Sequence, residues 1–370
     1  MNTAKTLLAV DGNSLLHRSF HAMASTGLTS SDGRPTWAVK GFISQLLAAV
    51  ERAGAHAIVV GFDDHTGSVR KSAHPHYKAN RPPKAPELGQ QIAMTIDLLR
   101  TCGIHVVVPA GLEADDVLAS ASASARAAGW RTVIVTSDRD SFALIRNDTS
   151  VLRVLNGGIS GSPILTPKSL ESMIAVPPHL YREYAALRGD TSDNLTGVPR
   201  IGEKTAAKLL AAFGSVQAAF DDVDQGGERV AAELGKSFVA VLGSANNRAA
   251  FWRNVEIMTM YTDIDLGLNL AGPGAGLLPL DPATLTGALA SLQLMSLQQS
   301  AVRTLCSEPQ QPNDPGSDAA SPAEHAGAGV DGGDAVRPAG PAHAPRALAT
   351  AGSMRGSTAP QPARWNDQIW

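Results

Sequence analysis

The stretch TLLAVD, residues 6–11, is a run of apolar residues that ends in a carboxylate. Similar apolar, β-branched runs follow at AIVVGFD (57–63), IHVVV (104–108) and RTVIVTSD (131–138). Runs of this kind are typical of strands buried inside a parallel sheet. Helical patterns separate them, at residues 38–53, 87–102 and 114–129. The alternation predicts an α/β fold in which helices cover both faces of a parallel sheet.

The pattern changes after about Thr166, where strands stop and short helical segments alternate with Pro and Gly. From about Ser307 the chain consists mainly of Pro, Ala, Gly, Ser and Asp, which favours disorder because little apolar surface can be buried. We therefore expect a sheet domain over residues 1–180, a helical region over 181–305 and a disordered tail over 306–370. The tail ends in RWNDQIW, either an incidental terminus or a peptide that binds a partner.

The bulk composition excludes several classes of protein. The 370 residues are 44% hydrophobic, yet no apolar run is long enough to span a membrane, and the N-terminus reads as a strand and not as a signal peptide. Cys102 and Cys306 have no metal-ligand spacing, so we expect a reduced, cytoplasmic protein. The net charge of −3 arises in the tail, which has seven acids and four bases after residue 306. The body is neutral, but its acids are clustered.

Acidic residues follow the predicted strands, at the edge where open parallel sheets bind ligands. They are Asp11, Asp63, Glu113, Asp115, Asp116, Asp138 and Asp140. Any single one could cap a helix or form an Asx turn, but seven on one edge would repel each other unless a cation lies among them. Oxygen ligands without a Cys/His set favour Mg²⁺ or Mn²⁺ over zinc. Two such ions about 4 Å apart serve phosphoryl transfer.

Two further segments point to a phosphate ligand. LRGDTSDN, residues 187–194, places Asp190 and Asp193 in what is either an ordinary turn or an extension of the acidic site. GVPRIGEKTAAKLLAAFGS, residues 197–215, predicts a glycine-bounded hairpin that leads into a helix with Lys204 and Thr205 in its first turn. Free N–H groups at such a helix start bind phosphates. A plain helix–turn–helix packing corner is the alternative.

A basic segment lies between Asp64 and Glu87 and contains no acid. Its cations are Arg70, Lys71, Lys78, Arg81 and Lys84, and Tyr77 among them could stack on a base. Cations that hold a phosphate backbone beside a metal site are what cleavage of nucleic acid requires. A solvated loop is the alternative.

Together these motifs resemble the flap endonuclease and 5′–3′ exonuclease family, which includes the nuclease domain at the front of bacterial DNA polymerase I. The matching stretches cover about Lys5 to Ser300: VDGNSLLHRSF, GFD, HYKANRPP, LEADDVLA, VTSDRDSF, LRGDTSDN and GVPRIGEKTAAKLL. Since no polymerase region follows, we expect a stand-alone nuclease. The chain departs from the family pattern at Val69, where an aromatic residue commonly stands, and at HTGS before it.

The resemblance implies a PIN-like α/β domain with a helical arch at about residues 64–86 and a helix–hairpin–helix motif. It assigns the first metal ion to Asp11, Asp63, Glu113, Asp115 and Asp116, and the second to Asp138, Asp140, Asp190 and Asp193. Glu113 and Asp115 should point towards the strand ends, and Asp116 should share their pocket. Asp63 and Asp115 would act in catalysis with Lys78 and Arg81 on the scissile phosphate. DNA contacts would come from Arg18, Arg70, Tyr77, Lys204 and Thr205, with a K⁺ site at Gly197 to Gly202.

The implied function is a structure-specific 5′ nuclease that acts on branched or 5′-ended duplex DNA, or on RNA/DNA primers, in primer removal, replication and repair. We expect a monomer in the cytoplasm near the nucleoid, with no membrane contact and with a polymerase or clamp as partner. A PIN-type ribonuclease would be shorter and would lack the arch and hairpin. A silent DNA-binding module would not need all nine acids. A haloacid-type phosphatase would need Asp-x-Asp, but Asp11 is followed by Gly12 and Asn13.

Overall fold

The computed structural model describes residues 4–308. The predicted disorder of the tail from residue 309 onwards, and the role of RWNDQIW, lie outside the described residues. Within residues 4–308, no helix combines the length and the apolar character that a membrane span needs.

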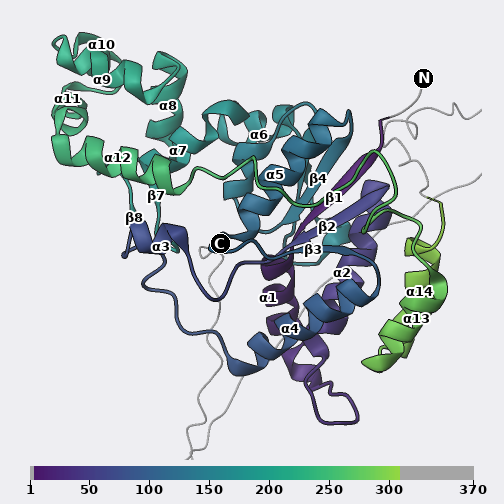
Figure 1. Cartoon of the computed structure of the whole chain (residues 1–370). Coiled ribbons are helices and arrows are strands. Elements are labelled where there is room, and N and C mark those ends of the chain that lie inside the picture. Colours follow the sequence, from purple (N-terminus) through teal and green to yellow (C-terminus); the bar gives the residue numbers. More distant parts are fainter. Residues whose placement is uncertain (1–3, 309–370) are drawn as a thin grey trace, which may run out of the picture. The chain divides into compact units, whose positions relative to one another are not determined.

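A six-stranded sheet lies at the centre of the structure, in the order β3-β2-β1-β4-β5-β6 (Figure 1). The strands are β1 (Thr6–Asp11), β2 (Ala57–Gly61), β3 (His105–Val107), β4 (Arg131–Thr136), β5 (Thr149–Arg153) and β6 (Ile164–Leu165). Strands β1 to β5 are parallel, and β6 is antiparallel to β5. The four predicted strands are confirmed. The short β5 and β6, which no apolar run marked, were not predicted.

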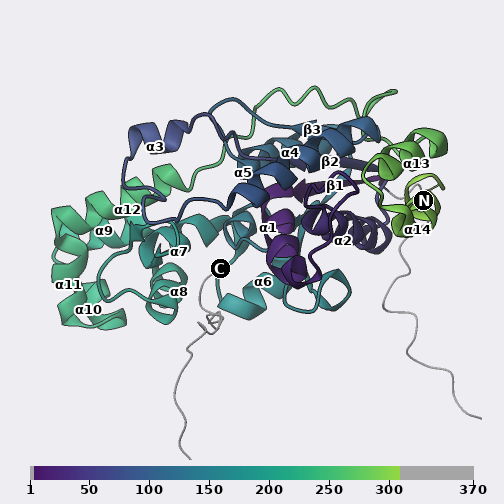
Figure 2. The same ribbon diagram turned by 90° about the horizontal axis from the view of Figure 1, so that it is seen from below.

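Alternating side chains of β1 enter two separate hydrophobic cores, as expected for a strand with both faces buried. Leu8 and Val10 face the layer formed by α1 (Gly12–Met23), α2 (Trp37–Ala53) and α4 (Pro86–Thr101). Leu7 and Ala9 face the layer that contains α5 (Ala114–Ala127). Figure 2 shows the same arrangement from below. The start of α5 approaches the sheet closely because β2 ends in Gly61: a Cβ there would lie 2.8 Å from Val117 Cβ.

The helical region after the sheet is confirmed. Its helices are α6 (Pro167–Ile174), α7 (Tyr181–Arg188), α8 (Glu203–Phe213), α9 (Val216–Asp224), α10 (Glu228–Glu233), α11 (Lys236–Gly243) and α12 (Ala245–Ile257). A two-stranded ribbon of β7 (Gly189–Asp190) and β8 (Leu195–Thr196) interrupts it. The prediction that strands stop after about Thr166 was therefore wrong at this ribbon.

The last two helices, α13 (Pro282–Ser291) and α14 (Met295–Leu305), correct the predicted domain boundary. They pack with α2 and α4 in the same core as Leu8, through apolar residues such as Leu285 and Leu289. They therefore cover the sheet domain and do not extend the predicted DNA-binding region.

The basic segment contains less helix than an arch would require. Only α3 (Val69–Ala73) is helical, and residues 75–80 form turns. Pro75, Pro82 and Pro83 lack backbone N–H groups and therefore oppose a longer helix. The predicted helical arch is thus a folded loop with one short helix, and its side chains contact the acidic edge of the sheet.

Candidate active site

The acids that follow β1 and β2 are held by their own local hydrogen bonds. Asp11 accepts from Ser14 N at 2.9 Å and from Thr136 Oγ1 at 2.8 Å. Asp63 accepts from Ala114 N at 2.9 Å and from the side chain of Asn13. Burial, with a contribution from the charge of Asp63, outweighs the hydrogen bonds and raises the pKa of Asp11 to about 7. Neutralising Asp11 with a proton or a cation is therefore favourable.

Asp138 and Asp140 follow β4, and Asp140 begins a 3₁₀ helix over Asp140–Leu144. The backbone N of Asp140 donates to Asp138 Oδ1 at 2.9 Å. Burial raises the pKa of both carboxyl groups, and the charges of Asp190 and Asp193 raise them further. Two segments about fifty residues apart in the chain thus contribute to one negative field.

The β7–β8 ribbon presents Asp190 and Asp193 to this field. Gly189 in β7 and Gly197 just after β8 let the backbones approach closely, since a Cβ on Gly189 would lie 2.3 Å from the N atom of Gly197. Gly189 also has a φ of +73°, which a side chain would disfavour. Ser192 N donates to Asp190 Oδ1 at 2.8 Å and stabilises the turn that carries both acids.

Lys78 bridges the acids expected at the first metal ion, through Glu113, and those expected at the second, through Asp193. Its Nζ lies 2.9 Å from Glu113 Oε1 and 4.0 Å from Asp193 Oδ2. Its backbone N donates to the Asp193 carbonyl at 2.9 Å, and Arg81 donates to Asp193 Oδ1. Burial lowers the pKa of Lys78, but the charges of Glu113 and Asp193 outweigh this and raise it above the ordinary value. Lys78 is therefore a charged ammonium inside the acidic group.

The structure corrects two predictions at Arg70 and Asp116. Arg70 is only 8% exposed and cannot present its charge to DNA. It donates to both oxygens of Asp116 at 2.7 Å, and to the carbonyls of Ile257 at 2.9 Å and Thr259 at 2.8 Å. Asp116 is fully buried and also accepts from Glu113 N at 3.1 Å, so its oxygens are directed at Arg70 and the helix start and not into the shared pocket.

Tyr77 is a further correction. It is 6% exposed, and its hydroxyl donates to Glu113 Oε2 at 3.0 Å. Its ring therefore packs in the core and cannot stack on a base. Tyr77 and Lys78 bind the two different oxygens of Glu113, which fixes that carboxylate from both sides.

Asp115 lies in surroundings opposite to those of its neighbour Asp116. Its Oδ1 is shielded from solvent and has no hydrogen-bond partner. Burial, together with the charges of Asp138 and Asp11, raises its pKa well above the ordinary range. An unpartnered carboxylate oxygen between two sets of acids is unstable unless a cation or proton reaches it.

The acids approach one another, but they are not arranged as a closed metal site. In residues 4–308, no three His, Cys, Asp or Glu side chains meet at metal-ligand spacing. Glu113 instead forms an ion pair with Lys78, and Asp193 forms one with Arg81. The residues still suit a hard divalent cation in two respects: the donors are all oxygens, and Asp115 Oδ1 has no partner.

The other predicted DNA contacts are accessible in part. Arg18, on α1, is half-buried and donates to Asn156 Oδ1 at 3.3 Å. Gly202 and Lys204 are exposed at the start of α8, with Thr205 half-buried beside them. Gly197 packs tightly against the backbone of the ribbon. The DNA contacts of Arg18, Gly197, Gly202, Lys204 and Thr205 remain predictions.

Sequence reasoning missed the residues that hold the acids. Asn13 binds Asp63, Thr136 binds Asp11, and Ser14 and Ser137 bond to each other across the strand ends at 2.6 Å. The signal was available in VDGNS and VTSD, where small polar residues flank each acid.

Two family models match the chain one after the other. The N-terminal resolvase-like domain of 5′–3′ exonucleases matches residues 6–173, and the C-terminal SAM fold of 5′–3′ exonucleases matches residues 176–273. The chain belongs to the 5′–3′ exonuclease family. This confirms the family recognised from the sequence motifs and the PIN-like sheet domain followed by a helical region.

Two curated relatives to which this 5′–3′ exonuclease family member is similar are DNA polymerases. DNA polymerase I of Mycobacterium tuberculosis is 36% identical over 261 residues, which are 70% of this chain and 28% of the relative. Thermostable DNA polymerase I of Thermus aquaticus is 39% identical over 219 residues, 59% of this chain and 25% of the relative. The chain thus spans about a quarter of the length of these relatives.

Solved structures support the fold. The bacteriophage T5 D15 protein co-crystallised with metal ions aligns with a TM-score of 0.55 at 17% identity, over 81% of this chain and 100% of that one. The catalytic core of Rad2 in complex with DNA substrate aligns with a TM-score of 0.54 at 15% identity, over 82% of this chain and 92% of that one.

Proposed function

We propose that this chain is a metal-dependent, structure-specific 5′ nuclease that hydrolyses phosphodiesters near the 5′ ends of DNA or RNA/DNA strands. One observation supports this above all: acids from five separate segments interact electrostatically, and Asp115 among them keeps an unpartnered oxygen. A site that concentrates negative charge in this way needs cations, and a polyanionic substrate needs the same cations to approach it.

The carboxylates would hold two Mg²⁺ or Mn²⁺ ions. Asp11, Asp63, Glu113 and Asp115 would hold one, and Asp138, Asp140, Asp190 and Asp193 the other; Asp116 is left out because Arg70 occupies it. When bound, such ions activate water and stabilise the leaving oxygen in phosphodiester hydrolysis. Asn13 and Thr136 would keep the carboxylates of Asp63 and Asp11 oriented.

Lys78 and Arg81 would exchange partners when substrate binds. Both now pair with acids of the site, Lys78 with Glu113 and Arg81 with Asp193. A phosphate entering between the two sets of acids offers the same kind of charge-assisted hydrogen bonds. The two side chains would then orient the scissile phosphate and free the carboxylates for metal ions.

The hairpin at residues 197–202 and the start of α8 would hold the downstream duplex through phosphate contacts, with K⁺ at the hairpin carbonyls. Binding should weaken steeply with salt because such contacts release counterions. The matching relatives are DNA polymerases, so we also propose roles in primer removal and repair, as a monomer among nucleoid DNA, with a polymerase or clamp as partner.

The test is cleavage of a 5′-labelled flap duplex with Mg²⁺, with EDTA, and by Asp138→Ala. We expect a 5′-phosphate product only from the wild type with Mg²⁺. Asp148→Ala, which removes a surface ion pair with Arg126, is the matched control and should cleave normally. Cleavage by the Asp138→Ala protein or in EDTA would rule out the metal mechanism. Cleavage of RNA hairpins and not of the flap would favour a PIN-type ribonuclease.

A further inference from the structure

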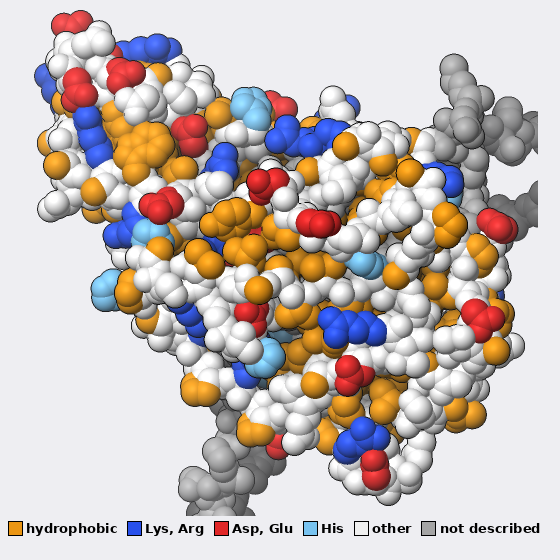
Figure 3. Space-filling view, in the orientation of Figure 1, with side chains coloured by type: hydrophobic (Ala, Val, Ile, Leu, Met, Phe, Trp, Pro, Cys, Tyr) orange, Lys and Arg blue, Asp and Glu red, His pale blue; other side chains and the backbone are white. Residues whose placement is uncertain are grey.

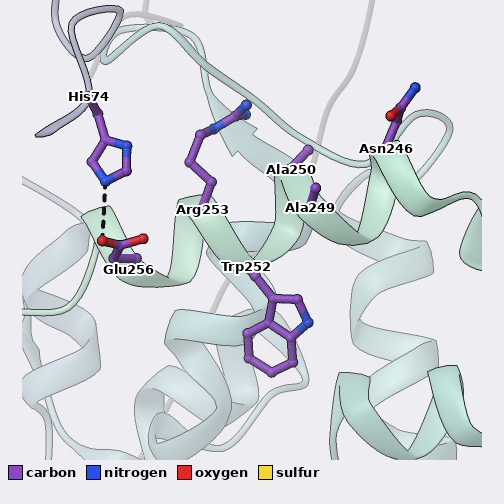
Figure 4. A pocket seen from close by; sticks show the side chains of 7 residues that line it. All are labelled: His74, Asn246, Ala249, Ala250, Trp252, Arg253 and Glu256. Atoms are coloured by element: carbon purple, nitrogen blue, oxygen red, sulfur yellow. Dashed lines mark ion pairs between the residues drawn. The ribbon is translucent and has the colours of Figure 1, made fainter.

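The outer face of α12 carries a groove that the proposed chemistry does not use (Figure 4). Its volume is about 670 Å³. From α12 it is lined by Ala249, Ala250, Trp252 and Arg253 among others, and His74 of the basic segment also lines it. Helix and loop thus form it together.

Trp252 lies at the surface although its helix is well anchored. Trp252 is 46% exposed, whereas Phe251 and Asn254 of the same helix are buried. Asn254 Nδ2 donates to the carbonyl of Thr196 in β8 at 3.0 Å, so the inner face of α12 is fixed to the ribbon. Figure 3 shows apolar side chains at the surface in the region where Figure 1 places α12, bordered by charged ones. The Trp252 ring contacts the buried Phe251 ring, with centroids 4.9 Å apart, and its solvent-facing part is available to a ligand.

The groove also offers positive charge. Arg253 is exposed, lies 3.3 Å from Asn254 Oδ1 through its Nη2, and forms no ion pair with a carboxylate in the part of the chain that the structure describes. His74 Nε2 lies 3.5 Å from Glu256 Oε1, so the one acid that lines the groove has a partner there. Trp252 and Arg253 both line the groove, and their side chains leave α12 in opposite directions (Figure 4). An exposed aromatic ring and an unpaired guanidinium are groups that bind the bases and phosphates of unpaired strands.

The position of the groove connects it to the proposed site. His74 directly precedes the turns that carry Lys78, which binds Glu113. At the end of α12, the carbonyl of Ile257 accepts from Arg70. On the inner side, α12 holds the ribbon that leads to the hairpin at residues 197–202. The groove therefore shares α12 with the ribbon and borders the basic segment that carries Lys78.

We propose that this groove binds a single-stranded segment of the nucleic acid, with a base stacked on Trp252 and a phosphate of the same strand paired with Arg253. The inference rests on the proposed function, because it places the unpaired strand of the same substrate. Stacking needs a base whose face is free, which a duplex offers only at its ends, so the occupant is a single strand and not the duplex arm.

The test compares the binding of two flap substrates, one with a long 5′ single strand and one with a single unpaired nucleotide, by fluorescence anisotropy with Ca²⁺ replacing Mg²⁺. In Trp252→Ala the dissociation constant for the long strand should rise about tenfold, the typical contribution of one stacked base. The rise should be smaller for the short flap, and Trp252→Phe should restore most of the affinity. Arg253→Gln should weaken long-strand binding and lower its salt dependence.

Met173→Ala is the matched control, because Met173 is 45% exposed and lines a different groove on α6. It should bind both substrates like the wild type, and all variants should share one unfolding temperature. Unchanged long-strand binding in both Trp252→Ala and Arg253→Gln would overturn the proposal. Loss of association with a DNA polymerase in Trp252→Ala, with DNA binding intact, would assign the groove to a protein instead. A failure of the nuclease proposal would show separately, as a wild type that cuts no flap.

Discussion

The first turn of α5 carries two neighbouring carboxylates, Asp115 and Asp116, in opposite surroundings. On one side, Asp116 is enclosed by Arg70, backbone N–H groups and the end of α12, and each of its oxygens has a donor. On the other side, Asp115 faces Asp11, Asp138 and Asp140, and one of its oxygens has none. The protein neutralises the first carboxylate itself and leaves an oxygen of the second without a partner. Under the proposed function, these adjacent residues would serve stability and chemistry separately.

The largest expected effect comes from Asp115→Asn. The amide keeps the shape but removes the negative charge, so the single-turnover rate of flap cleavage with Mg²⁺ should fall at least about a thousandfold, the several kcal/mol that a bound metal supplies. Since the charge of Asp115 is repelled by its neighbours, the unfolding temperature in EDTA should stay the same or rise. A variant that cleaves at the wild-type rate would show that Asp115 does not serve the reaction.

Asp116→Ala should have the converse result. It leaves the buried Arg70 guanidinium with only the longer contact to Glu113, at 3.4 Å, as an ion pair. The free energy of unfolding should therefore fall by about 3–5 kcal/mol, measured by denaturant titration. The control is Asp148→Ala, which breaks the exposed pair with Arg126 and should cost less than about 1 kcal/mol. Equal small losses in the two variants would show that the buried pair is not a structural support.

The sequence predicted this edge of the sheet but could not assign its individual carboxylates. Strand periodicity placed Asp11, Asp63 and Asp138 together because the ends of parallel strands meet. Asp115 and Asp116 differ by about 100° around a helix, and either could have faced the strands. The choice depends on Arg70, 46 residues earlier in the chain, which enters the core beside Asp116.

The same limit applied to the basic segment. Lys78 and Arg81 lie beside the acids, where the sequence placed them. The row of cations in the sequence did not reveal which cation of the segment would be buried in the core. Arg70 is buried because the carbonyls of Ile257 and Thr259, which no pattern could place, accept its remaining N–H groups. Long-range partners of this kind become visible only in the folded chain.

A smaller effect should appear in the pH dependence of stability. The pKa of Asp11 is about 7 in the folded protein against an ordinary value of 3.8, so the folded state binds this proton more tightly than the unfolded state does. The resulting stabilisation is complete below about pH 4 and is lost as the pH rises through 7. In EDTA the unfolding temperature should therefore fall over this window, on the order of 5 °C.

Mg²⁺ should counter this loss, because it replaces the protons that the acids release. The increase in unfolding temperature on adding Mg²⁺ should be larger at pH 8 than at pH 5. Asp116→Asn serves as a comparison, since Asp116 lies outside the proposed ligand set and its variant should keep a response to Mg²⁺. An unfolding temperature that rises with pH in EDTA would contradict the mutual repulsion of these acids.

The smallest effect separates the two interpretations of Tyr77. Tyr77→Phe keeps the ring and removes only the hydroxyl that donates to Glu113. The free energy of unfolding should fall by about 1 kcal/mol, the usual net contribution of one hydrogen bond. Flap cleavage should slow less than tenfold because Arg70 still donates to the same oxygen of Glu113. A ring that stacked on a base would give the opposite pattern, since phenylalanine stacks as well as tyrosine: Tyr77→Phe would be silent and Tyr77→Ala would weaken DNA binding without destabilising the fold. Denaturant titrations and anisotropy on the same two variants decide between a buried support of the carboxylates and a contact to DNA.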